Sequence, residues 1–444
     1  MESKLKQGLK PLIAQRQKLG VCILAAVLTL FNQPAFSDTS KKHVTIASQI
    51  LNGDHRAQIN RSLEAFSQLH ENITVELISF RDSSNYASQV EQWLEQGHGP
   101  NVFFWYGGER ITALSEKKQL HKLDDIWQEQ KLDKLFPKAV LDSVQRNSSR
   151  YAIPITFYLW AMYYRQQKMK NLNITPPSTW DEVLQNCKEL RSQGIDLFSL
   201  GTKSDIWVMY PWFDYLLLRV GGIAFYKELT SGKISYYDPR VKQALSHLQT
   251  LVEGDCFNHN TDAYSLWQAF PRVLHGFSAM SLIEGLPQRH LPSRIHNDVR
   301  VAPFPEVEKG HAQYVVGMVN VFVVPSYTQL TPELEKLLIF LTSDNFQTTF
   351  NLPIGRLPAR ASSIKKFPPL VQDMAAIVDK APGSTLTFDR ETNINFSKHV
   401  PKILVDFLTH KNIQTSTEQL EHWRQRIYST PQERSPNEER NTEQ

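Results

Sequence analysis

The sequence predicts an α/β fold in two lobes, and two observations carry that prediction. Apolar residues near the N-terminus alternate between the spacing of strands and the spacing of helices. The chain of 444 residues also exceeds the ~250 to 300 residues at which a single hydrophobic core stops growing. We therefore expect two lobes, each built on a doubly wound sheet flanked by helices.

The first lobe is predicted from a strand and helix alternation. Residues 44–46 and 73–77 have the period of two that strands show, and residues 59–66 and 86–96 have helical spacing. Residues 102–105 form a continuous apolar run, as a parallel strand buried on both faces requires. The resulting βαβαβ order predicts parallel strands joined by right-handed crossovers.

The second lobe is predicted from helix caps and buried strands. Residues 177–182 combine prolines, an N-cap and a capping box ahead of a helix, and Asp238 with Pro239 caps another helix. Residues 277–283 and 314–324 are apolar enough for buried strands, and Thr331 opens a further helix. From residue 429 onward almost nothing is apolar, which predicts a disordered tail.

The N-terminus has the pattern of an export signal. A basic stretch precedes the apolar residues 21–31, and small Ala35 and Ser37 follow at the positions that a signal peptidase reads. Cleavage is expected before Asp38, so residues 1–37 form the signal peptide. The alternative is an uncleaved anchor, although the apolar run is shorter than the ~20 residues a spanning helix needs.

Charge argues against a nucleic-acid partner. The chain has 49 Lys and Arg against 45 Asp and Glu, but residues 1–37 hold five of the former and one of the latter, which leaves 44 of each. A mature chain with balanced charges has no excess of basic residues with which to bind a polyanion such as nucleic acid. Cys187 and Cys256 remain after cleavage, and their spacing leaves open whether they form a disulfide or stay as buried thiols.

Motifs for catalysis, metals and cofactors are missing from the sequence. It contains no phosphate-binding glycine loop, no zinc-binding histidine pair on a helix and no serine nucleophile elbow. Gly107 and Gly108 follow a strand but lack the third glycine of a dinucleotide site. We therefore expect no catalytic residues, no metal and no cofactor.

Polar and aromatic residues gather where predicted strands end. Residues 52–55 follow the first strand and residues 105–110 follow the third, so both loops should face one crevice at the carboxyl edge of the sheet. More aromatic side chains come from residues 157–160, from Trp207 beside Asp205, and from Trp267. Aromatic faces beside carboxylates and amides suit a ligand with apolar faces and a rim of hydroxyls, such as a sugar.

Other aromatic side chains are expected to pack in the core. Trp212, Phe213 and Trp127 belong to this group. Trp105 is assigned to the crevice, because it ends a strand at a glycine-rich turn.

Five motifs in order resemble one family between about residues 41 and 360. They are residues 99–105, 151–154, 177–182, 276–280 and 316–318. With these motifs the chain resembles the family 1 extracellular solute-binding proteins of sugar ABC transporters, which include maltose-binding protein. Residues 207–219 resemble the subgroup that takes glucosides and other oligosaccharides.

The resemblance implies a set of ligand-binding positions. Where the family has an acid just after the chain crosses to the second lobe, this chain has Thr156, and Tyr158 and Trp160 are expected to compensate. Residues 284–286 stand where the family has a tryptophan. The implied ligand-binding residues are Asn52, Asp54, His55, Trp105, Tyr106, Glu109, Arg110, Tyr158, Trp160, Asp205, Trp207, Trp267, Glu284 and Gly317.

The resemblance also implies the type II periplasmic binding protein fold and its mode of action. Residues 38–152 with about 315–360 would form the N-terminal lobe, and residues 153–314 with about 361–428 the C-terminal lobe. Hinges are expected near residues 151–155, 311–316 and 357–364. A monomer in the periplasm would close on a di- or oligosaccharide and deliver it to the permease subunits of an ABC importer in the inner membrane.

Two other functions fit the same residues. A carbohydrate hydrolase would need paired carboxylates across the cleft, which Asp54, Glu109, Asp205 and Glu284 could supply. A periplasmic sensor would present the closed form to a membrane receptor or sensor kinase. The sequence does not separate sensing from transport.

Overall fold

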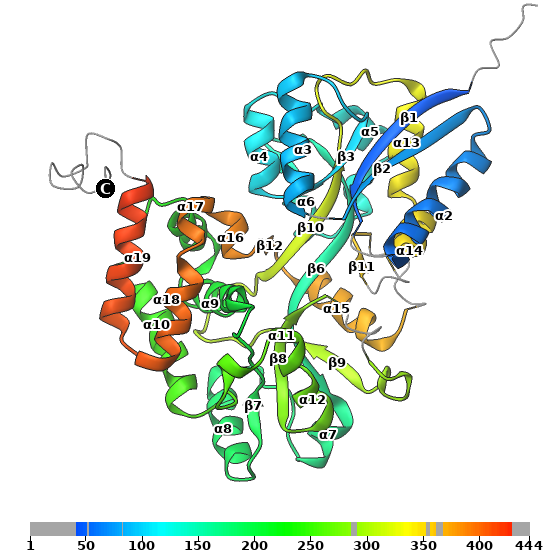
Figure 1. The fold of residues 1–444 in the computed structure, drawn as a ribbon. Helices are drawn as coiled ribbons and strands as arrows, with labels where there is room; N and C mark the ends of the chain where they lie inside the picture. Colours follow the sequence, from blue (N-terminus) through cyan, green and yellow to red (C-terminus); the bar gives the residue numbers. More distant parts are fainter. Residues whose placement is uncertain are drawn as a thin grey trace, which may run out of the picture.

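The computed structural model describes residues 41–50, 53–81, 83–285, 291–351, 356–360 and 367–428. The predicted signal peptide and the predicted C-terminal tail lie outside these ranges. A ten-stranded mixed sheet has the path β2-β1-β3-β10-β6-β8-β7. Helices surround it in two lobes, one around β1 to β3 and the other around β7 to β9 (Figure 1). The predicted α/β fold is confirmed.

The first lobe has the predicted βαβαβ order. Its strands are β1 (Lys42–Gln49), β2 (Ile73–Phe80) and β3 (Val102–Tyr106), and β1 pairs in parallel with both others. Helices α2 (Gly53–Leu69) and α3 (Ser83–Gln96) make the crossovers. The apolar positions that predicted them are buried, among them Ile59 and Phe66.

Shorter elements complete this lobe after β3. They are α4 (Glu109–Glu116), α5 (Asp124–Glu129), η1 (Leu132–Lys134), α6 (Lys138–Leu141) and the hairpin of β4 (Gln145–Arg146) with β5 (Ser149–Arg150). The chain returns later with α13 (Pro332–Thr342) and α14 (Asp344–Asn351), which pack against β6 and the first-lobe elements β1 and α2. Trp127 is 2 % exposed and lies in the core, as predicted.

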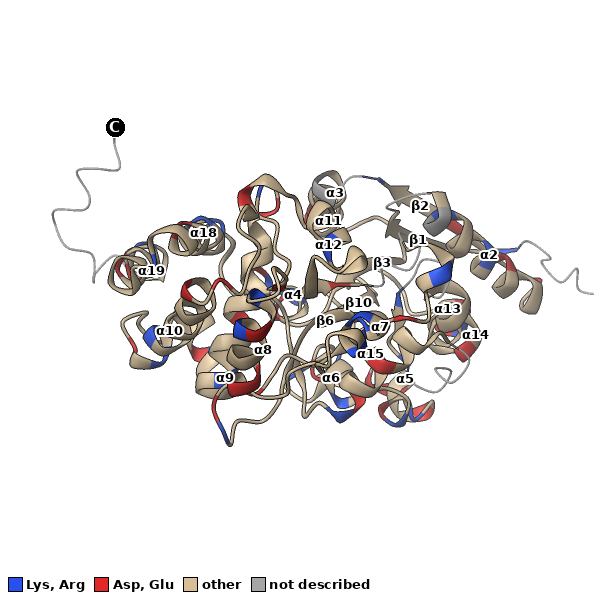
Figure 2. Ribbon diagram, turned by 90° about the horizontal axis from the view of Figure 1, so that it is seen from below, with Lys and Arg blue, Asp and Glu red and all other residues tan. Residues whose placement is uncertain are grey.

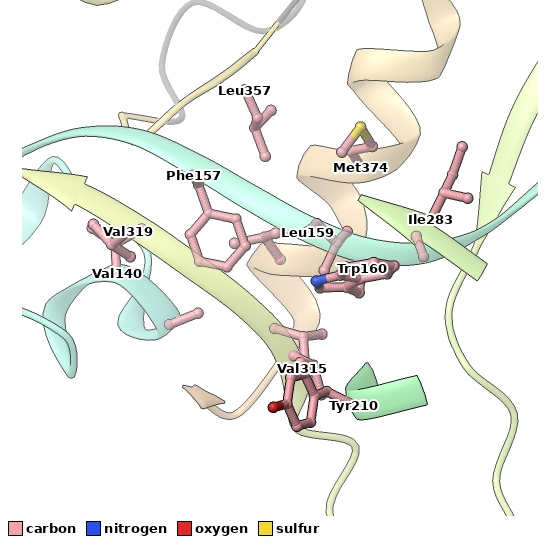
Figure 3. Close-up of a cluster of buried hydrophobic side chains, with 14 of the residues drawn as sticks. Val140, Phe157, Leu159, Trp160, Tyr210, Ile283, Val315, Val319, Leu357 and Met374 are labelled. Atoms are coloured by element: carbon pink, nitrogen blue, oxygen red, sulfur yellow. The ribbon is translucent and has the colours of Figure 1, made fainter. Parts of the chain in front are cut away.

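Two long strands join the lobes. The first half of β6 (Ala152–Arg165) pairs with β10 (Val315–Val323) and with β11 (Leu357–Pro358), and its second half pairs with β8 and β9. β10 is antiparallel to both β3 and β6, so the sheet is mixed, not purely parallel. Apolar side chains of both strands gather at this junction (Figure 3). The predicted hinges at residues 151–155 and 311–316 lie at the starts of β6 and β10. The third, at residues 357–364, begins at β11, and its residues 361–364 lie outside the described chain. The lobe boundaries and hinges stay predictions.

The second lobe begins with α7 (Gln166–Asn171) and α8 (Trp180–Arg191). Thr179 caps α8, since its side chain accepts a hydrogen bond from the Glu182 N–H. β7 (Asp196–Phe198) pairs in parallel with β8 (Ser278–Glu284), and β9 (Val299–Ala302) pairs with β6. Cys187 of α8 forms a disulfide with Cys256, which follows α10 (Pro239–Glu253).

Helices form most of the second lobe. They are η2 (Ile206–Val208), α9 (Met209–Thr230), α10 (Pro239–Glu253), η3 (Thr261–Ala263), α11 (Leu266–Ala269), α12 (Pro271–His275) and η5 (Ser293–Ile295). Asp238 caps α10 as predicted, and its side chain accepts from the Arg240 N–H. Trp212 and Phe213 of α9 are 1 % and 0 % exposed, so their prediction as core residues is confirmed.

The C-terminal segment of the described chain packs on the second lobe. It comprises α15 (Pro369–Lys380), β12 (Ser384–Thr385), α16 (Phe388–Glu391), α17 (Ile394–Ser397), α18 (Val400–His410) and α19 (Ile413–Tyr428). α18 and α16 contact α9, and α19 contacts α10. Basic and acidic residues are interspersed over the helices (Figure 2), in keeping with the near balance of 49 and 45 charges.

Candidate functional site

A cavity of about 340 Å³ lies where the second lobe meets the two joining strands. β6, β8, β10, η2, α9 and the segment around α16 contribute to its wall. Its lining residues are Trp160, Trp207, Tyr210, Pro211, Glu284, Met318, Thr387, Asp389 and Arg390. Three of the predicted residues, Trp160, Trp207 and Glu284, are thus brought together.

Trp160 and Trp207 form an aromatic corner in this cavity. Their ring centroids are 5.8 Å apart and the rings meet edge to face at 73°. Trp160 is held from behind, because its backbone carbonyl accepts a hydrogen bond of 2.5 Å from the Tyr215 hydroxyl. Trp160 is only 2 % exposed, whereas 36 % of Trp207 remains exposed. Trp207 is therefore the face of this corner that a ligand can cover.

The α16 segment is fixed in the cavity by a buried acid of α9. The Asp214 carboxylate accepts hydrogen bonds from the Tyr226 hydroxyl at 2.9 Å and from the Phe388 N–H at 3.1 Å. Burial raises the pKa of Asp214 well above its ordinary value. The Phe388 ring is fully buried and packs against Phe213. This anchor sets the position of the polar residues on either side of Phe388.

Those polar residues supply charge to the cavity. The Thr387 hydroxyl donates to the Asp389 carboxylate at 2.7 Å, and the Arg390 guanidinium pairs with the same carboxylate at 3.2 Å. Arg390 also lies over the ring of Tyr106, 5.0 Å from its centroid. Since Tyr106 ends β3 of the first lobe, this contact joins the two lobes beside the cavity.

Glu284 ends β8 directly opposite Trp160 in the strand pairing. Burial raises the pKa of Glu284 to about 7, Asp389 raises it further, and Arg390 and Arg356 lower it. The carboxyl group therefore changes its charge near neutral pH. Either form can hydrogen-bond a hydroxyl group, the neutral form as donor and the anion as acceptor.

The predicted residues Tyr106 and Tyr158 lie on the neighbouring strands β3 and β6. The Tyr106 hydroxyl donates to the Gln49 side chain at 3.1 Å. Arg356 lies over the Tyr158 ring at 5.0 Å. Burial raises the pKa of Tyr158 to about 12, while Arg356 acts in the opposite direction. Both phenols thus have a cation against one face.

The site residues predicted after β3 lie in two different environments. Trp105 is 7 % exposed, packs edge to face on Phe103, and has its ring centroid 5.9 Å from that of Tyr106. Its indole N–H donates to the Arg110 carbonyl at 3.4 Å. Glu109 lines a separate polar cavity of about 510 Å³. Trp105 therefore presents little ring surface to a ligand in this structure.

The remaining predicted residues have structural contacts. The Asp205 carboxylate accepts from the Leu266 N–H at 2.9 Å and so ties η2 to α11. Trp267 is 47 % exposed on α11 and is not among the residues that line the 340 Å³ cavity. At Gly317 an added Cβ would lie 2.5 Å from the Tyr158 carbonyl oxygen. Glycine there lets β10 approach β6 closely.

The predicted residues after β1 cannot be placed in the same way. Asn52 lies outside the described residues. Asp54 and His55 belong to α2, but their side chains are not described.

Sequence reasoning missed the α16 segment and Tyr210. Asp389 and Arg390 are far from the predicted loops in sequence and carry no strand-end pattern. Tyr210 is 6 % exposed, and its hydroxyl donates to the Ser397 carbonyl at 2.8 Å. A usable signal was the isolated acid Asp214 within an apolar helix, since a buried carboxylate needs hydrogen-bond donors from elsewhere.

The described part of the chain has neither a cluster of metal ligands nor a membrane-spanning helix. No three His, Cys, Asp or Glu side chains there come together as a metal site. Among the helices of that part, none combines the length and apolar character needed to cross a membrane.

Comparison with known proteins finds similarity to one family. Residues 52–252 match the family model of bacterial extracellular solute-binding proteins. This part of the chain is similar to the bacterial extracellular solute-binding proteins. An uncharacterised ABC transporter extracellular-binding protein of Pyrococcus horikoshii is 25 % identical over 318 residues, covering 69 % of each chain.

Solved structures of solute-binding proteins share the two-lobed fold. The bacterial solute receptor AcbH, described as preferring β-D-galactopyranose, has a TM-score of 0.79 at 16 % identity, with 88 % of this chain and 98 % of that chain covered. A chitin oligosaccharide binding protein has a TM-score of 0.69 at 18 % identity, with 86 % and 98 % covered. The chain therefore has the predicted periplasmic binding protein fold.

Proposed function

We propose that this solute-binding protein captures a carbohydrate, a di- or oligosaccharide, between its lobes and delivers it to an ABC importer. In this proposal the chain is exported by its N-terminal signal peptide, acts as a monomer in the periplasm, and meets the permease subunits in the inner membrane. The proposal rests on the family, on the chemistry of the cavity, and on the sugar ligands named for the similar structures.

The arrangement of Trp207 beside charged groups carries the proposal. A sugar ring has apolar C–H faces and a rim of hydroxyls. The exposed face of Trp207 can pack against the apolar C–H face of a sugar, and the carboxyl groups of Glu284 and Asp389 can hydrogen-bond its hydroxyls. An amino acid or a metal chelate would not need an aromatic platform of this size, so a carbohydrate is the better match.

Lobe closure would complete the site. The lining residues of the cavity belong to the second lobe and the joining strands, and Tyr106 of the first lobe lies beside the cavity against Arg390. A ligand gains its full contacts only when both lobes surround it, and it stabilises the closed state by that difference in affinity. The contact between Arg390 and Tyr106 is a place where first-lobe and second-lobe side chains already meet.

We infer that no bond in the sugar is broken. Glu284 and Asp389 line one cavity and could be compared with the carboxylate pair of a glycosidase. In our account they accept and donate hydrogen bonds only. Incubation of the purified protein with its sugar, followed by chromatography, should return the sugar intact, and release of shorter sugars would favour a hydrolase instead.

A thermal-shift screen of the purified chain tests the ligand class. The panel contains mono-, di- and oligosaccharides, amino acids and polyamines. A ligand at ~100 times its Kd stabilises the folded state by ~2.7 kcal/mol, a shift that is readily measured. Stabilisation by oligosaccharides alone is expected. A response confined to amino acids or polyamines would overturn the carbohydrate assignment while leaving the family unchanged.

A further inference from the structure

A second cavity, of about 480 Å³, lies away from the sugar site. It is bounded by α9, the start of α8, the connection from β9 to β10, and α15. None of its lining residues lines the cavity around Trp207. Its apolar wall includes Phe304, whose ring stacks on Tyr215 with a centroid distance of 4.6 Å and an angle of 7°. The proposed function leaves this cavity without a role.

The unusual residue in its wall is Arg219 of α9, which is 1 % exposed. Its Nη1 donates to the Tyr314 carbonyl at 2.9 Å, and its guanidinium lies over the Tyr215 ring at 5.2 Å. Its Nε is buried without a hydrogen-bond partner, and no described carboxylate lies within 4.0 Å of it. Burial lowers the pKa of Arg219 to about 10. A buried cation of this kind is costly unless an anion compensates it.

The other charges of the wall leave an excess of positive charge. Lys380 at the end of α15 adds a second cation, and Glu306 is the acid among the described lining residues. Glu306 is close enough to favour the charged form of Arg219, but it forms no ion pair with it. Two cations and one carboxylate give the wall a net positive charge of one, which a ligand with one negative charge would neutralise.

We propose that this cavity binds a small monocarboxylate with an apolar body. The carboxylate would pair with Arg219 and be attracted by Lys380, and the apolar body would pack against Phe304 and Ile377. A guanidinium matches a carboxylate in geometry and makes strong, charge-assisted hydrogen bonds with it. Sugars lack such a charge, so this site would take a different class of ligand from the cleft.

Titration calorimetry and ligand-detected NMR on the full chain test the proposal with benzoate and hexanoate as probes. Benzamide and hexanamide serve as neutral controls of nearly equal shape. Each acid should bind about tenfold more tightly than its amide, because only the acid forms the charge-assisted pair. Absence of acid binding, or equal binding of acid and amide, would overturn the proposal.

Variants locate the binding. Ala376 is exposed on α15 and lines the cavity, so Ala376→Trp should block it without disturbing the core and weaken acid binding at least about tenfold. The matched control is Ala113→Trp, at an exposed helical alanine outside both linings, which should bind like the wild type. Unchanged binding in Ala376→Trp would place the probes elsewhere and refute the proposal.

Charge variants give effects of opposite sign. Glu306→Gln removes a repelling charge and should tighten acid binding about two- to threefold. Arg219→Met should abolish the preference for acid over amide, and circular dichroism with a cooperative thermal unfolding transition shows whether that variant is folded. Retention of the preference in a folded Arg219→Met variant would contradict the proposal. Failure of the sugar screen would leave these results interpretable, since they use other probes and another cavity.

Discussion

Replacement of Trp207 by alanine should weaken sugar binding about 30-fold. The exposed 36 % of this residue corresponds to roughly 90 Å² of a side chain of about 250 Å². If a sugar covers half of that area, the lost burial is ~1 kcal/mol at ~25 cal/mol per Å². Loss of the aromatic contact adds ~0.5 to 1.5 kcal/mol. The sum of ~2 kcal/mol corresponds to about 30-fold in Kd.

Titration calorimetry with the sugar found in the thermal-shift screen measures this effect. Trp207→Phe should lose less, because a smaller aromatic face remains. Phe277→Ala is the matched control, since Phe277 is 60 % exposed and lies outside the cavity lining. A Kd for Trp207→Ala within twofold of the wild type would refute the assignment of Trp207 as the sugar platform.

Three further predictions concern stability. Glu284 has a raised pKa in the folded protein, about 7 against an ordinary 4.5, so the folded state holds its proton more tightly than the unfolded state between those values. The free energy of unfolding should therefore fall by up to about 3 kcal/mol as pH rises from 4.5 to 7. Urea unfolding at several pH values should show that the Glu284→Gln variant lacks this contribution. Identical pH profiles for the variant and the wild type would contradict the prediction. Replacement of Cys187 and Cys256 by serine removes a disulfide between residues 69 apart in sequence. The free energy of unfolding, measured with urea, should fall by about 4 kcal/mol while sugar affinity stays unchanged. An unchanged unfolding midpoint would contradict this prediction. Gly317→Ala should destabilise the protein by about 1 to 3 kcal/mol in thermal unfolding, because its Cβ would lie 2.5 Å from the Tyr158 carbonyl oxygen. A variant as stable as the wild type would show that β10 and β6 can move apart without cost.

Local patterns were sufficient to predict much of the fold. The apolar run at Val102–Trp105 and the strands before it gave the parallel β1, β2 and β3, because burial on both faces requires such a run. The caps at Thr179 and Asp238 gave the starts of α8 and α10, since the unpaired N–H groups of a helix end need acceptors. The antiparallel pairing of β10 with β3 and β6 could not be predicted from local patterns, because it depends on long-range contacts of the chain.

The candidate site was predicted less completely. Trp160 and Trp207 were identified from aromatic residues beside polar ones, Glu284 came from the resemblance to the family, and the three meet in one cavity. Asp389 and Arg390 were missed because a long-range hydrogen bond, from Phe388 to Asp214, brings them there. The assignment of Trp105 to the crevice stays a prediction, and in this structure 7 % of the residue is exposed.

The most direct test of the central claim is a crystal structure of the protein with the oligosaccharide that stabilises it most. The account predicts a sugar ring lying against Trp207, with hydroxyl groups hydrogen-bonded to Glu284 and Asp389. A sugar bound outside this cavity, or a ligand that touches none of these three residues, would contradict it.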